Sequence, residues 1–191
     1  MSPTTNPEGQ PSRVEKSFVA RKAIYRNDLT VFAYELMFRN NELDQPAFTN
    51  GDQATAQVVL NTFMEIGLER VVGSSVAFVG VTRNFLLSDY CLLLPKERLV
   101  LQLAEDTIPD PPMLEAVSRL WKDGYLFALD NVRYAEWLRP LLALVDVVKI
   151  DVKSLGLEAV GKQVELLRQF GVKLLAKNVE THEEFETCKK L

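Results

Sequence analysis

The sequence predicts an α/β fold in which a parallel sheet curls into a TIM-type barrel and helices wrap its outside. Short continuous apolar runs alternate along the chain with amphipathic stretches, a pattern typical of buried parallel strands covered by helices. Polar residues follow nearly every apolar run, and barrels place functional side chains at the carboxyl ends of many strands. The alternative is an open, doubly wound sheet. It is disfavoured because no glycine-rich phosphate loop follows a strand.

Composition and charge exclude several classes of protein. The 191 residues are 47% hydrophobic and 25% charged, which suits one globular domain with a sizeable core. A net charge of −4 predicts no nucleic-acid-binding surface. The longest apolar stretch, 141–148, is broken by Asp146 and falls far short of the roughly 20 residues of a membrane span, so we expect no membrane association and a cytoplasmic location. Cys91 and Cys188 are expected to be ordinary thiols of a reducing compartment.

The N-terminal part of the chain separates into a leader and a hairpin. Residues 1–16 contain three prolines and few large apolar side chains, so we expect a disordered leader before a single domain at 17–191. Two β-type runs follow at 18–25 and 31–37. Residues 26–28 between them have the composition of a turn, which predicts an antiparallel hairpin.

The rest of the chain alternates between strands and helices. Further strands are expected at 76–81, 99–103, 126–129, 147–150 and 174–176. Helices are expected at 52–66, from Pro111 to just before Gly124, at 135–144, at 157–170 and from about Glu183 onward. These strands number seven with the hairpin, one fewer than a closed eight-stranded barrel requires.

Four strand ends carry recognisable motifs. They are YELMFR at 34–39, FALDN at 127–131, VKID at 148–151 and AKNVET at 176–181. In order and spacing they resemble the EAL domain family, whose members hydrolyse cyclic di-GMP. In that comparison Glu35 matches the signature glutamate, and the signature arginine, four residues further on, matches Arg39.

The resemblance is closest to the branch in which an EAL domain precedes an HDOD domain. The segment LRPLL at 138–142 carries this likeness, and the resemblance extends from about Ser17 to Leu191. In that branch the chain continues through a glutamine-glycine-tyrosine strand. We therefore expect the N-terminal part of a longer bacterial protein, with a barrel that lacks at least its last strand.

The family resemblance implies a metal-dependent hydrolysis, with two Mg²⁺ or Mn²⁺ ions held mainly by carboxylates. The chain retains the family's residues at Glu35, Asp130, Lys149, Asp151 and Glu180. It departs at Gly80, Gln102, Asn131 and Lys177, where the family has asparagine, glutamate, aspartate and glutamate. Three of these changes make the site more positive. We therefore expect no metal, no other cofactor and no catalysis, with Mg²⁺ or Mn²⁺ bound only if the chain is an unusual phosphodiesterase.

Ligand binding is a separate question from catalysis. The resemblance implies that Arg39, Glu35, Asp130 and Lys149 contact the ligand, while Lys22 replaces a family glutamine. We also predict that Lys177 lies among Glu35, Asp130 and Glu180 as a built-in counter-ion. The alternative is that these carboxylates merely cap strand ends, paired with Arg39, Lys149 and Lys177. His182, the only histidine, is expected at an exposed helix start.

These observations favour a degenerate, non-catalytic signalling domain that acts through protein contacts. The expected partners are an unidentified protein and, as candidates, cyclic di-GMP and a second copy of the chain. One alternative is a weak metal-dependent cyclic-di-GMP phosphodiesterase. The other is a purely structural scaffold for a C-terminal HDOD-like domain.

Overall fold

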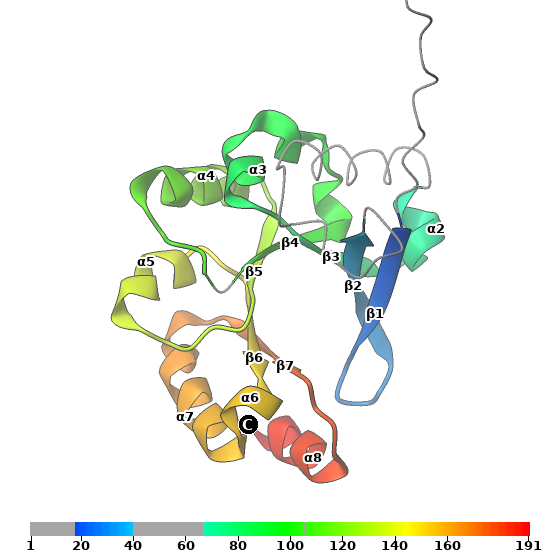
Figure 1. Ribbon diagram of the computed structural model, residues 1–191, viewed down its shortest axis with the longest axis vertical. Coiled ribbons are helices and arrows are strands. Elements are labelled where there is room, and N and C mark those ends of the chain that lie inside the picture. Colours follow the sequence, from blue (N-terminus) through cyan, green and yellow to red (C-terminus); the bar gives the residue numbers. More distant parts are fainter. Residues whose placement is uncertain (1–17, 40–66, 105) are drawn as a thin grey trace, which may run out of the picture.

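A computed structural model describes residues 18–39, 67–104 and 106–191, which form a curled seven-stranded sheet with helices on its outer side (Figure 1). The strands are β1 (Phe18–Tyr25), β2 (Val31–Arg39), β3 (Val76–Gly80), β4 (Leu99–Leu103), β5 (Leu126–Leu129), β6 (Val147–Asp151) and β7 (Lys173–Lys177). The α-helices are α2 (Leu68–Val72), α3 (Arg83–Leu87), α4 (Pro111–Lys122), α5 (Arg139–Leu142), α6 (Val152–Leu155), α7 (Leu157–Leu167) and α8 (His182–Lys190). Four 3₁₀ turns are η3 (Asp89–Leu93), η4 (Lys96–Arg98), η5 (Glu136–Leu138) and η6 (Arg168–Phe170). The expected leader at 1–16 and the expected helix at 52–66 lie outside the described residues.

Strand order confirms the barrel-type architecture. Each strand pairs with the next one in sequence, from β1 to β7, and all pairs except β1–β2 are parallel. A doubly wound sheet would have a strand order that reverses at a switch point, so that alternative is excluded. Because every parallel connection runs in one direction around the sheet, the carboxyl ends of β2 to β7 meet at one rim of a half-barrel.

The N-terminal hairpin forms where the sequence predicts it, with a loop at 26–30 that is slightly longer than expected. The Arg26 amide donates to the Thr30 carbonyl at 2.8 Å and closes the loop. Asp28 Oδ1 accepts hydrogen bonds from the Thr30 amide at 3.0 Å and the Thr30 hydroxyl at 2.6 Å. Within the hairpin Lys22 lies directly opposite Glu35, so these two side chains share one face of the sheet.

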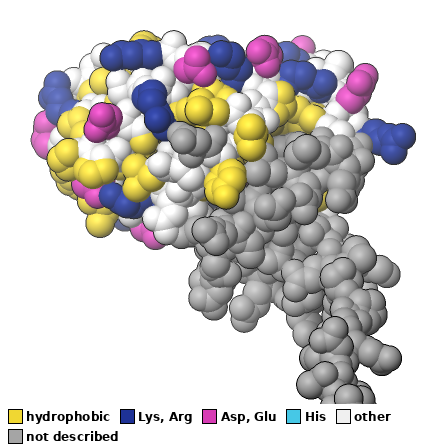
Figure 2. Space-filling view, turned by 90° about the horizontal axis from the view of Figure 1, so that it is seen from above, with side chains coloured by type: hydrophobic (Ala, Val, Ile, Leu, Met, Phe, Trp, Pro, Cys, Tyr) yellow, Lys and Arg dark blue, Asp and Glu magenta, His cyan; other side chains and the backbone are white. Residues whose placement is uncertain are grey.

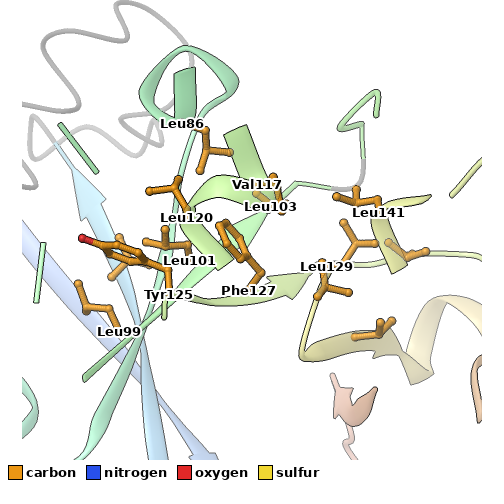
Figure 3. Packing of buried hydrophobic residues seen from close by; sticks show 14 of the residues in the cluster. Leu86, Leu99, Leu101, Leu103, Val117, Leu120, Tyr125, Phe127, Leu129 and Leu141 are labelled. Carbon is orange, nitrogen blue, oxygen red and sulfur yellow. The ribbon is translucent and has the colours of Figure 1, made fainter. Parts of the chain in front are cut away.

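The two faces of the sheet bury different apolar layers. On the inner face of the half-barrel, a small cluster comprises Ala33, Phe78, Val100 and Ala128. On the outer face a larger layer packs against the helices, and Figure 3 shows Leu101, Leu103 and Phe127 of the sheet beside helix residues such as Leu120. The alternation of side chains along β4 explains the division, because Val100 faces inward while its neighbours face the helices.

Capping side chains fix where the longer helices begin. Asp110 accepts a hydrogen bond from the Met113 amide at 3.0 Å at the start of α4, where proline at the first helical position is also favourable. At the start of α8, Thr181 and Glu184 form a reciprocal capping box. His182 is the first residue of α8 and is exposed, as expected.

One predicted helix has the wrong extent, and several short helices were not predicted. The expected helix at 135–144 is instead the 3₁₀ turn η5 followed by the single-turn helix α5, which has Pro140 in its first turn. Pro140 lacks an amide hydrogen and cannot sit in the interior of one continuous helix. The helices α2, α3 and α6 each have five residues or fewer, too short for hydrophobic periodicity to reveal them.

The surface of the described part is mixed in character. Figure 2 shows lysine and arginine side chains interspersed with acidic and hydrophobic ones on the face that it presents. No helix in the described ranges is long and apolar enough to cross a membrane. Cys91 is buried and Cys188 is half-buried, and both are free thiols, as expected.

Candidate functional site

Five polar side chains meet inside the half-barrel, just beyond the inner apolar layer. They are Glu35, Gln102, Asp130, Lys149 and Lys177, and we call them the polar cluster. Strand alternation positions them. Gln102 is two residues beyond Val100 on β4, and Asp130 is two residues beyond Ala128 at the end of β5. The cluster therefore lies toward the carboxyl rim, on top of an apolar floor.

Lys149 forms the centre of the polar cluster. It lies in the middle of β6, and its side chain is only 2% exposed. Its Nζ lies 2.7 Å from Glu35 Oε1, 2.9 Å from Gln102 Oε1 and 3.5 Å from Asp130 Oδ1. Two of these oxygens accept hydrogen bonds from the ammonium group, and Asp130 adds a longer ion pair, so the buried cation is compensated from three sides.

Gln102 joins the two carboxylates of the cluster. Its Nε2 donates to Glu35 Oε1 at 3.1 Å and to Asp130 Oδ2 at 3.0 Å, while its Oε1 accepts from Lys149. These contacts define the orientation of the amide, because the reversed orientation would direct its NH₂ group at the ammonium group. A carboxylate at this position could not donate to either acidic partner.

Lys177 completes the cluster from the end of β7. Its Nζ donates to Asp130 Oδ1 at 3.0 Å, and its side chain is 24% exposed. The cluster thus contains two carboxylates, two ammonium groups and one neutral amide, and its formal charge is zero.

The surroundings of Glu35 lower the pKa of its carboxyl group. Burial opposes ionisation of the Glu35 carboxyl, but the Lys149 charge, the hydrogen bonds from Lys149 and Gln102, and the more distant Lys177 charge together outweigh it. The pKa of Glu35 is consequently lowered from its ordinary value of 4.5. Glu35 is therefore ionised near neutral pH, and its Oε1 accepts hydrogen bonds from both Lys149 and Gln102.

The donor set of the cluster does not fit a pair of hard divalent cations. Mg²⁺ and Mn²⁺ require several free oxygen ligands, whereas Glu35 Oε1 and both oxygens of Asp130 already accept hydrogen bonds from nitrogen donors. Gly80, which lies in register with Gln102 on the neighbouring strand, has no side-chain oxygen to contribute. Within the described residues, no group of three or more His, Cys, Asp or Glu side chains could hold a metal ion.

The other residues singled out in the sequence lie outside the polar cluster. Asp151 caps α6 through the Ser154 amide at 3.0 Å and accepts from Asn178 at 2.9 Å. Glu180 pairs with Lys153 at 2.7 Å on the solvent side. The prediction that Lys177 lies among three carboxylates is therefore wrong for Glu180.

The remaining candidates are placed only by their backbones or lie at the rim. Lys22 is exposed on the same face as Glu35. Asn131 follows Asp130 directly with a left-handed φ of 55° and lines a cavity of about 470 Å³ with Arg133 and Trp137. Arg39 is the last residue of β2, and the position of its side chain lies outside what the structure describes.

The sequence indicates the members of the polar cluster but not the residues that contact the other candidate carboxylates. Asn178 and Lys153, which engage Asp151 and Glu180, gave no signal in the sequence. Phe78, which lies in register with Glu35 and belongs to the inner apolar layer, reads in the sequence as an ordinary strand residue. The structure places Asn178 in a left-handed conformation with a φ of 57°, which asparagine adopts more readily than most residues.

Comparisons with known proteins find two curated relatives by sequence and several solved structures with the same fold. No family model matches the chain. The chain is 32% identical over 178 residues to the protein YuxH of Bacillus subtilis, an alignment covering 88% of this chain and 42% of that protein. It is 31% identical over 176 residues to the cyclic di-GMP phosphodiesterase CdgJ of Vibrio cholerae, covering 91% and 41%. The chain thus spans about two fifths of the length of these relatives.

Solved structures show the same fold at lower sequence identity. The EAL domain of Mycobacterium smegmatis DcpA superposes with a TM-score of 0.66 at 19% identity, covering 91% of this chain and 85% of that one. The EAL domain of Pseudomonas aeruginosa FimX, bound to c-di-GMP, superposes with a TM-score of 0.67 at 16% identity, covering 91% and 84%. These likenesses establish the fold, and the two curated relatives add the sequence relationship.

Proposed function

From the premise that this chain is an EAL-like domain, we propose that it is a non-catalytic signalling domain that binds cyclic di-GMP without metal and acts through protein contacts. The names of two similar proteins motivate the ligand. FimX has been solved bound to c-di-GMP, and CdgJ is named as a cyclic di-GMP phosphodiesterase. Function nonetheless depends on the site rather than the fold, so the proposal rests on the polar cluster.

The observation that carries the non-catalytic part is the engagement of both central carboxylates. Glu35 and Asp130 are held by Lys149, Gln102 and Lys177, and their charges are already balanced. Activation of water at neutral pH by divalent ions needs carboxylates that are free to coordinate those ions. Because Glu35 Oε1 and both Asp130 oxygens accept hydrogen bonds from nitrogen donors, few carboxylate oxygens remain for the ions that would supply a metal-bound nucleophile.

Cations at the same rim support binding of an anion. Lys22 is exposed on the inner face opposite Glu35, and Lys177 retains part of its exposure while it contacts Asp130. Ammonium groups are effective partners of phosphate oxygens, although they act as point charges rather than as a bidentate fork. Two lysines in this position could attract the phosphates of a cyclic dinucleotide without any divalent ion.

The test combines turnover and binding in the same protein. We expect no hydrolysis of cyclic di-GMP with 5-fold or greater excess of Mg²⁺ or Mn²⁺, and we expect calorimetric binding in the presence of EDTA. Lys22→Ala should weaken that binding by roughly 5-fold or more, because one charged hydrogen bond is lost. Lys162→Ala, an equally conservative change on the exposed face of α7, should not. Metal-dependent turnover would contradict the proposal that the domain is non-catalytic. Cyclic di-GMP binding that requires metal would contradict the proposal of metal-free binding.

The output of such a domain requires a partner, and we propose a protein partner or a second copy of the chain. The chain covers about two fifths of its curated relatives, so regions of a longer protein are further candidates for that contact. Light scattering across a concentration series distinguishes the two cases. A mass that doubles with concentration supports self-association, and a constant monomer mass supports a heterologous partner.

A further inference from the structure

We infer that Gln102 and Lys177 together replace divalent cations as the groups that hold Glu35 and Asp130 side by side, so that changing these two residues to glutamate would create a metal site in this chain. The inference deepens the non-catalytic proposal, on which it rests for the metal-free state of the cluster. It concerns what stabilises the rim, and it does not depend on which ligand the rim binds.

The starting point is the repulsion that the cluster must overcome. Glu35 and Asp130 both lie within hydrogen-bond distance of the same Gln102 nitrogen, at 3.1 and 3.0 Å. Their side chains are only 22% and 20% exposed, so water screens their mutual repulsion poorly. Two ionised carboxylates at such close range are stable only if nearby positive charges or hydrogen-bond donors compensate them.

Lys149 compensates one of the two carboxylates well and the other less well. Its Nζ is 2.7 Å from Glu35 but 3.5 Å from Asp130, a distance at which the ion pair remains but the hydrogen bond is lost. Asp130 therefore needs further donors. It receives one from Gln102 at Oδ2 and one from Lys177 at Oδ1, so that each of its oxygens accepts one short hydrogen bond.

The two residues act in complementary ways. Gln102 contributes geometry, because one NH₂ group donates to both carboxylates as a bridging cation would contact both. Lys177 contributes charge, because its ammonium group brings the four charged side chains to a sum of zero. A divalent ion would supply both the bridge and the charge in a single group. In this chain two side chains on β4 and β7 divide those tasks.

Substitution of both residues by glutamate should therefore replace compensation by Gln102 and Lys177 with compensation by a bound divalent ion. Lys177→Glu with Gln102→Glu places four carboxylates around Lys149 at the carboxyl rim. That set has enough hard oxygen ligands for a divalent ion, and in its absence the like charges repel each other. The double variant should be unstable without metal and should regain stability when Mn²⁺ binds its folded state.

Thermal unfolding in EDTA and in a Mn²⁺ titration tests this inference, with Mn²⁺ binding followed independently by electron paramagnetic resonance. Lys177→Glu should lower the Tm in EDTA by about 3–6 °C, whereas Lys177→Arg should lower it by less than about 2 °C, because the cation is kept. Lys162→Glu makes the same charge change beside Glu158 on the exposed surface of α7 and should have little effect. In the double variant the Tm should rise with Mn²⁺ concentration, and the signal of free Mn²⁺ should fall.

Two results would overturn the inference. One is a Tm in EDTA for Lys177→Glu equal to that of Lys162→Glu. The other is a folded double variant that binds no more Mn²⁺ than the unaltered protein. If the double variant fails to fold without metal, refolding from urea with and without Mn²⁺ replaces the melt, and recovery that is independent of Mn²⁺ counts against the inference. Cyclic di-GMP binding by the unaltered protein is measured separately, so a failure to bind that ligand leaves this inference standing, whereas metal-dependent turnover by the unaltered protein would contradict both proposals.

Discussion

At the scale of single residues, Lys149 is the side chain on which the polar cluster depends most. A buried cation loses its hydration, and only good geometry with several acceptors repays that loss. Lys149 has three oxygens within 3.5 Å and almost no exposure, so its removal leaves Glu35 and Asp130 facing each other in a poorly hydrated space. The Lys177 ammonium group donates to Asp130, so it is not placed to hold both carboxylates as Lys149 does.

We therefore expect Lys149→Met to lower the free energy of unfolding by about 3 kcal/mol, because an uncompensated buried charge remains after the change. Chemical denaturation in urea, with the slope compared between variants, measures the effect. Lys162→Met removes a lysine whose side chain is 70% exposed and serves as the matched control. A loss no larger than that of the control would mean that the cluster contributes little to stability.

The lowered pKa of Glu35 leads to a prediction about acid. Because the folded protein favours the ionised carboxylate, Glu35 contributes stability that is complete above its ordinary value of 4.5 and is lost as the pH falls through the lowered folded-state pKa. Glu35→Gln should consequently have a lower Tm than the unaltered protein near pH 7, and the two melting curves should converge as the solution becomes acidic. A Tm difference that is unchanged between pH 7 and pH 3 would contradict this assignment.

The members of the cluster could be predicted from the sequence, but their contacts could not. Motif positions identified Glu35, Asp130 and Lys149 because each lies at the end of an apolar run or within one. Which carboxylate pairs with which lysine depends on the register between strands that are distant in sequence. The Lys149–Glu35 contact joins residues 114 positions apart, and no local pattern specifies it.

At the scale of secondary-structure elements, Asp110 shows how one side chain can serve two elements. Its Oδ1 caps α4 through the Met113 amide, and its Oδ2 pairs with Arg83 of α3 at 2.7 Å. Asp110→Ala should lower the Tm by about 2–4 °C, because the cap is lost. Asp110→Asn can still accept the amide hydrogen bond and loses only the half-exposed ion pair, so it should lower the Tm much less. Equal losses in the two variants would assign the effect to the ion pair rather than to the cap.

Strands were more predictable than helices, and the reason is physical. Every strand from β3 to β7 lies within about one residue of its expected bounds. For β3 to β6 the reason is that a strand buried on both faces reads as a continuous apolar run. The single-turn helices α3 and α6 depend instead on caps such as Thr82 and Asp151, which are common polar residues in any loop. Pro140 is the opposite case, because its interruption of the expected helix at 135–144 follows from the sequence alone, since proline cannot occupy a helix interior.

At the scale of the whole molecule, the half-barrel separates a large apolar layer from a small one. The outer layer buries most of the core between sheet and helices, whereas the inner cluster contains a single large side chain, Phe78, among Ala33, Val100 and Ala128. The polar cluster adjoins this inner layer, since Glu35 of β2 is in register with Phe78 on the neighbouring strand β3. The stability of the rim and the packing of the barrel interior should therefore be coupled.

Phe78→Ala tests that coupling. Phe78 is 1% exposed, and its truncation should lower the free energy of unfolding by about 3–5 kcal/mol through lost burial and a residual cavity. Phe78→Leu keeps most of the volume and should cost about 1 kcal/mol, while Phe32→Ala, at a site 39% exposed on β2, should cost less than either. Coupling between the inner apolar layer and the polar cluster adds a second expectation.

In a Phe78→Ala background, Glu35→Gln should reduce stability by less than it does in the unaltered protein. The reason is that water entering the widened interior hydrates the Glu35 carboxylate and weakens its dependence on Lys149. A double-mutant cycle in urea measures this difference directly. Additive losses would show that the inner layer supports the barrel without supporting the polar cluster above it.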